Sequence, residues 1–115
     1  QKEFEVRANG DLAIRGSFIS NGTTLNVPDY VFESDYPLMP IEELEAFVRS
    51  ERHLPNVPSG SEIREQGLNV SEFQMRLLRK VEELTLYTLE QEKTIRALKT
   101  RLARLEDSER RHNGR

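Results

Sequence analysis

The sequence predicts an elongated α+β chain with short N-terminal strands, a proline-rich collar and a long C-terminal helix that forms a parallel trimeric coiled coil. Three observations predict this fold. Apolar and polar residues alternate in the first 27 residues, all five prolines lie between Pro28 and Pro58, and no proline follows Ser71. We therefore divide the chain into a β-rich segment, a collar, a helix and a polar tail, at residues 1–27, 28–70, 71–109 and 110–115.

The composition favours burial between chains over a large private core. Of 115 residues, 36% are hydrophobic and 32% are charged, which leaves little apolar material for one chain to bury. A net charge of −3 gives no reason to expect a nucleic-acid partner, and no run of 18 apolar residues predicts membrane insertion. Cysteine is absent, so the chain has neither disulfides nor thiol chemistry.

The first segment is predicted to form two or three short strands. Phe4 and Val6 alternate with charged residues, as Leu12 and Ile14 do further on. Tight turns are expected at Asn9-Gly10 and Asn21-Gly22, because Asn and Gly tolerate positive φ. Strands this short bury too little surface to be stable alone.

Two helices are expected in the collar. The first runs from Ile41 to about His53, with Pro40 at its start, acidic residues in its first turn and basic residues near its end. The second runs from Ser61 to Gln66, with Gly67 as a left-handed stop.

The long helix is predicted from Ser71 to about Glu109. Ser71 and Gln74 fit a capping box, in which each side chain satisfies a free backbone N–H group. At 1.5 Å per residue the helix is roughly 58 Å long, too long to fold inside so small a globule.

Heptad periodicity makes this helix a coiled-coil candidate rather than a single helix packed on its own domain. Counting back from Leu105 places ten residues at positions a and d, of which seven are apolar. After Gln74, the predicted trimer seam is Leu77, Val81, Leu84, Thr88, Gln91, Ile95, Leu98, Leu102 and Leu105.

The stretch RLARLE, residues 101–106, indicates three strands. In the heptad frame Arg101 is at g and Glu106 at e, flanking Leu102 and Leu105. This order resembles the short motif of parallel three-stranded coiled coils, in which the arginine meets the glutamate of the next chain. Thr88 and Gln91 suit the hydrated layers that a wider seam accommodates.

A second apolar stripe lies outside the seam and stops at Leu89. We expect the collar to cover it, leaving a bare stalk beyond; the sequence leaves open if a collar covers its own helix or a neighbour's. The stripe is Met75, Leu78, Leu86, Tyr87 and Leu89, and the expected cover is Tyr30, Phe32, Leu38, Met39, Leu44, Phe47, Leu54 and Val57.

Residues 29–91 resemble the C-terminal region of tail-fibre-domain proteins of bacterial secreted and phage-like fibres. The shared landmarks are DYVFE at residues 29–33, HLP at 53–55, PS at 58–59, GLN at 67–69 and EELTLY at 82–87. The resemblance implies a trimeric fibre end preceded by a β-rich shaft, at a cell surface, on a virion or in the extracellular space.

Catalysis is not expected. The related self-cleaving chaperones of phage tail spikes use a serine with a lysine base, but no lysine lies near Ser17 or Ser20, and a serine without a base is a weak nucleophile. His53 and His112 are far apart, so no metal site is predicted, and no cofactor is expected. The carboxylates Glu82 and Glu83 are interpreted as solvated.

The sequence therefore predicts a non-enzymatic homotrimer that registers three chains and assists their folding as an intramolecular chaperone. The alternative is a receptor- or glycan-binding tip. Its candidate ligand surface combines aromatic and acidic residues, which can stack on and hydrogen bond to a sugar: Tyr30, Phe32, Asp35 and Tyr36. Packing against the coil explains the same aromatic residues without a ligand.

Overall fold

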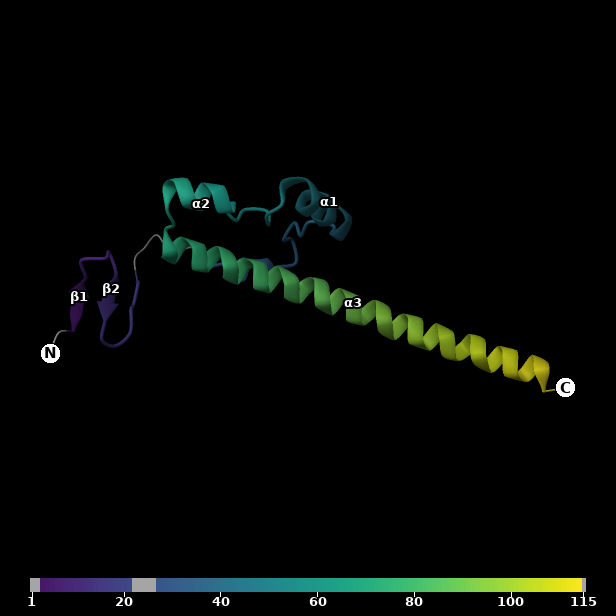
Figure 1. Ribbon diagram of the computed structural model, residues 1–115. Coiled ribbons are helices and arrows are strands. Elements are labelled where there is room, and N and C mark those ends of the chain that lie inside the picture. Colours follow the sequence, from purple (N-terminus) through teal and green to yellow (C-terminus); the bar gives the residue numbers. More distant parts are fainter. Residues whose placement is uncertain (1–2, 22–26, 115) are drawn as a thin grey trace.

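A computed structural model describes residues 3–21 and 27–114 and shows an elongated α+β chain. The molecule measures 84 × 36 × 31 Å, and its radius of gyration is 23.3 Å. A compact domain of this length has a radius of gyration of roughly 13 Å. The elongation comes from one long C-terminal helix, α3, which extends far beyond the rest of the chain (Figure 1).

The N-terminal segment forms an antiparallel hairpin of β1 (Phe4–Val6) and β2 (Leu12–Ile14). Phe4 pairs with Ile14 and Val6 with Leu12, so all four apolar side chains share one face, which is exposed. Gly10 closes the predicted turn with φ 95°. The second predicted turn, at Asn21-Gly22, extends into residues outside the described ranges.

The collar contains three short helices. They are a 3-10 helix η1 (Asp29–Phe32), which the sequence did not predict, then α1 (Ile41–Glu51) and α2 (Gly60–Gln66). Helix α1 ends two residues before the expected His53, because Arg52 adopts the left-handed conformation while its N–H still donates to the Val48 carbonyl.

Helix α2 begins one residue earlier than expected and carries the capping box of this region. Ser59 accepts a hydrogen bond from the Glu62 N–H, and the Glu62 carboxylate accepts one from the Ser59 N–H. Gly67 ends the helix with φ 78° and ψ −170°, which corrects the expected left-handed stop. Its φ is positive, but its ψ is extended.

Helix α3 (Val70–Asn113) has 44 residues and is about 66 Å long. Its N-cap is Asn69, whose side chain accepts from the Glu72 N–H at 3.1 Å, so the capping box predicted at Ser71 is wrong. The helix continues four residues past Glu109, into the predicted tail. Basic residues in its last turn favour this extension, because they complement the negative end of the helix dipole.

Candidate functional site: an open seam and its collar

The a and d positions of α3 form a seam that the single chain leaves open along its whole length. The exposed fraction of its seven apolar side chains runs from 40% at Leu77 to 61% at Leu84. The two polar seam residues, Thr88 and Gln91, are also exposed. Single exposed leucines are ordinary on protein surfaces, but seven exposed apolar residues at heptad spacing, interrupted only at Thr88 and Gln91, are typical of an interaction surface.

The lower half of α3 is bare on every side. From Thr88 to Gly114 each residue is exposed. The ion pairs described in this half join residues of the same helix, such as Arg96 and Glu92 at 3.0 Å. In proteins most helical stability comes from packing of an apolar face rather than from the helix propensity of the residues. No other described part of the chain packs on this half of the helix, so its apolar seam residues are in contact with water.

Arg101 and Glu106 lie in this bare half, on opposite edges of the seam. Within the described residues neither makes an ion pair in the single chain. Positions g and e of one helix flank the seam from its two sides, so a pair between them requires two chains.

The collar packs against the outer side of its own helix, opposite the seam. Helix η1 contacts α3, and Val31 of η1 is only 1% exposed. Glu82, at an outer b position of α3, is 7% exposed. The sequence left open which helix a collar covers, and the structure shows that it covers part of the outer face of its own; Leu78 and Leu89 are exposed, which corrects the expectation that the collar covers the whole second stripe.

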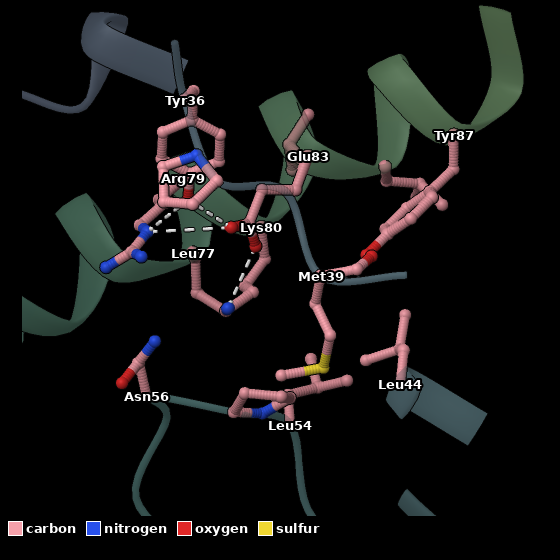
Figure 2. Close-up of a pocket in the computed structure, with 14 residues that line it drawn as sticks. Tyr36, Met39, Leu44, Leu54, Asn56, Leu77, Arg79, Lys80, Glu83 and Tyr87 are labelled. Atoms are coloured by element: carbon pink, nitrogen blue, oxygen red, sulfur yellow. Dashed lines mark hydrogen bonds and ion pairs between the residues drawn. The ribbon is translucent and has the colours of Figure 1, made fainter. Parts of the chain in front are cut away.

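Five residues, which we call the clasp, join the collar to α3: Tyr30, Tyr36, Arg79, Lys80 and Glu83. The Tyr36 hydroxyl donates a hydrogen bond to the Glu83 carboxylate and accepts one from Arg79 Nε at 3.0 Å. Lys80 Nζ donates to Glu83 Oε1 at 2.9 Å (Figure 2). The Arg79 guanidinium lies 5.8 Å from the Tyr30 ring centre and 5.9 Å from that of Tyr36, within cation–π range.

The clasp shifts the titration of its members. Burial raises the pKa of Glu83, but hydrogen bonds from Lys80 and Tyr36 and the positive charges of Lys80 and Arg79 outweigh it, so that the pKa is lower than the ordinary 4.5. Burial raises the pKa of Tyr36 above 10.0, and the hydrogen bond to Glu83 raises it further. At neutral pH the clasp therefore holds a charged Glu83 and a neutral Tyr36.

The carboxylates of Glu82 and Glu83 were expected to be solvated, and this expectation is wrong. The Glu83 side chain is 14% exposed and Glu82 is more deeply buried. Burial raises the pKa of Glu82, and the negative charge of Asp29 and a hydrogen bond with it raise the pKa further. Glu82 Oε2 has no hydrogen-bond partner among the described residues. η1 was not predicted, so neither was its contact with Glu82.

Two further hydrogen bonds fix the collar along α3. The Tyr87 hydroxyl donates to the Met39 carbonyl at 2.5 Å, and Arg76 donates to the Asn56 carbonyl at 3.1 Å. Both bonds hold the chain that enters and leaves α1, while α1 itself stands off from α3 (Figure 1).

An apolar groove of about 490 Å³ lies between α3 and the stretch of collar around α1. Met39, Leu44 and Leu54 gather on the side of the groove opposite α3 (Figure 2). On the helix side, the groove includes Leu77, Val81 and Leu84, which belong to the seam. The groove and the open seam are therefore one continuous surface.

The four residues of the candidate ligand surface do not all face one way. Tyr30 and Tyr36 are engaged in the clasp, with ring centres 5.8 Å apart. Phe32 is 54% exposed, which corrects its assignment to the cover of the coil, and Asp35 is also exposed. The side chain of this segment that is buried against α3 is that of Val31, which lies between two aromatic neighbours and was not predicted to be buried.

Comparison with known proteins finds no matching family model, no matching curated protein and no matching solved structure. In the described part of the chain, no helix is both long and apolar enough to span a membrane. The described residues also contain no group of three or more His, Asp or Glu side chains placed to hold a metal ion.

Proposed function

We propose that the chain is a non-enzymatic trimerisation module at the C-terminal end of a fibre. The observation that carries the proposal is the open seam, seven exposed apolar residues at a and d positions over four heptads of one helix. Three parallel copies bury this row completely, because each knob inserts among the residues of the facing helices.

Three strands are favoured over two by the residues that flank and interrupt the seam. Arg101 and Glu106 form no ion pair with another described residue and lie at g and e, where the helices of a trimer bring them together. Thr88 and Gln91 place two polar layers in the middle of the seam, which a three-stranded core hydrates more easily and which fix the register.

The fibre context is supported by the N-terminal hairpin and by the resemblance to tail-fibre-domain proteins. Phe4, Val6, Leu12 and Ile14 form an exposed apolar face, as expected for the end of a β-structure whose side chains pack against the other chains. In this proposal the fibre lies outside the cell, at its surface or on a virion.

The module acts on folding through effective concentration. Helices form within microseconds, whereas pairing of strands from different chains is slow and exposes aggregation-prone edges. Once α3 associates, the three N-terminal segments are held together and their pairing becomes intramolecular.

The proposal is tested by the concentration dependence of α3. Because association stabilises the helix by mass action, its melting temperature in circular dichroism rises as the chain concentration is raised. A melting temperature that stays constant over a hundredfold range of concentration contradicts the proposal.

An exposed aromatic favours a second candidate, a receptor- or glycan-binding fibre tip. Phe32 is 54% exposed and Asp35, three residues further along the chain, is also exposed, and an exposed aromatic and an exposed acid are residue types that suit a sugar. A glycan array tests this candidate: specific binding that is lost in Phe32→Ala favours it, and an array without specific binding rejects it.

A further inference from the structure

The collar of one chain extends past the g edge of its helix. It starts with η1 near Glu82, at position b, and passes the clasp residues of α3 at positions f, g and c. It then reaches Tyr87, at position g, through the Met39 carbonyl. Beyond this edge Met39, Leu44 and Leu54 overhang the seam and form the outer wall of the groove.

The opposite edge of the same helix carries two exposed leucines, one at position e and one at position b, a heptad beyond the b position that η1 covers at Glu82. Leu78, at position e, is 38% exposed, and Leu89, at the adjacent position b, is 61% exposed. These are the two leucines of α3 that lie outside the seam and are exposed. The single chain thus has a groove with apolar walls on one edge and uncovered leucines on the other.

A parallel coiled coil brings these two edges together, because the g edge of each helix lies beside the e edge of the next. We propose that the groove of each chain is the seat of the α3 helix of a second copy. In this arrangement Leu78 and Leu89 of one copy pack against the groove wall of its neighbour. The inference rests on the proposed coiled coil and identifies the partner of the groove.

The groove residues lie at the same heights along the α3 axis as the two exposed leucines, as this assignment requires. Arg76 holds Asn56, two residues after Leu54, beside the start of the seam, at the level of Leu78. Tyr87 holds Met39 at the level of Leu89. The overhanging wall therefore has an apolar residue near each of the two leucines.

The seat also explains why α1 stands off from its own helix. In the groove Leu44 of α1 lies across from the seam residues Leu77, Val81 and Leu84, and no side chain of the described residues fills the space between them. A neighbouring helix fills this space with apolar groups. Each collar then binds two helices, its own through the clasp and the next through the groove, and three collars close a ring around the first half of the coil.

Cysteine crosslinking tests the seat, because the chain has no cysteine of its own. Chains with Met39→Cys are mixed with tagged chains carrying Leu89→Cys, unfolded and refolded together, and oxidised. We expect a crosslinked heterodimer. The matched control replaces Leu89→Cys by Glu90→Cys, whose side chain points away from the neighbour's groove, and we expect at least tenfold less heterodimer. A second pair, Leu54→Cys with Leu78→Cys, checks the upper end of the groove.

The seam is measured separately, by the mass of each variant in solution and by oxidation of Leu98→Cys, which crosslinks like chains at a d position. If the variants are trimeric and Leu98→Cys crosslinks, but neither groove pair gives more heterodimer than the control, then the groove does not bind the neighbouring helix, while the proposed trimer stands. If all variants are monomeric, both proposals fail.

Discussion

The Tyr36 hydroxyl donates a hydrogen bond to the carboxylate of Glu83, 47 residues further along the chain. This contact joins the collar to the outer side of α3, while the seam on the other side of the helix remains open. One face of the helix is thus used by its own chain and the other is available for neighbouring chains.

Tyr36→Phe tests the clasp. The substitution keeps the ring but removes the hydroxyl that bonds to Glu83 and Arg79, and a hydrogen bond to a charged group contributes about 1.5–3 kcal/mol. Since the site is partly exposed, we expect a loss toward the lower end of this range in the free energy of collar opening. Hydrogen exchange of the Val31 amide, which donates to the Pro28 carbonyl at 2.9 Å, measures this opening.

The control for the clasp is Tyr30→Phe, because Tyr30 contacts Arg79 through its ring. We expect exchange of the Val31 amide to stay within twofold of the wild type in this variant. Equal exchange in wild type and Tyr36→Phe would show that the hydroxyl does not hold the collar.

The raised pKa of Glu82 makes the stability of the collar depend on pH, and the direction of this dependence follows from the shift. Its pKa in the folded chain is raised above the ordinary 4.5, so the folded state holds the proton more tightly than the unfolded state. This contribution to stability is complete below pH 4.5 and is lost as the pH rises through the raised pKa. Glu82→Gln should therefore slow Val31 exchange at pH 7 relative to the wild type.

The same experiment separates Glu82 from Glu83. The lowered pKa of Glu83 stabilises the folded chain above the ordinary 4.5 and the contribution is lost as the pH falls through the lowered value, the reverse of Glu82. Glu83→Gln should therefore weaken the collar at pH 7. If the two Gln variants change exchange in the same direction, the environments assigned to the two carboxylates are wrong.

Leu98→Asp tests the seam in the bare half of the helix. A charge at a d position of three chains faces itself across the core, and we expect a loss of about 5 kcal/mol or more per trimer and dissociation into single chains. Thr100→Asp adds the same charge at position f, on the outer surface, and should leave the assembly intact. Sedimentation velocity of both variants gives the comparison, and equal behaviour would rule out the assigned heptad frame.

Arg101 and Glu106 are predicted to form ion pairs between chains. Exchanging one for the other singly, as Arg101→Glu or Glu106→Arg, places like charges at each contact and should lower the stability of the trimer by about 1 kcal/mol per contact. The double exchange should restore most of this loss. Thermal melts at low salt measure the three variants; a double exchange no more stable than the less stable single variant would contradict the pairing.

The sequence predicted the strands, the collar helix α1 and the long helix, since each depends on a local period, cap or break. It did not predict η1 or the burial of Val31 and Glu82, because these depend on which residues the folded collar brings against α3. The position of the helix cap was also wrong. Asn69 and Ser71 are both good cap residues, and the path of the chain out of α2 decides between them.

The heptad pattern located a seam, and the structure shows its seven apolar residues exposed. The groove was beyond prediction, because it depends on how far the collar overhangs the g edge. Tyr87 illustrates the difference: its place in the second stripe was readable from the sequence, whereas its bond to the Met39 carbonyl required the folded chain.

The central claim is that the open seam of α3 is buried among three parallel chains. Sedimentation equilibrium of the purified wild-type chain measures this most directly, because the mass it gives does not depend on molecular shape. We predict a mass three times that of one chain at micromolar concentration. A mass of one chain at every accessible concentration would contradict the claim, and a mass of two chains would contradict the trimer.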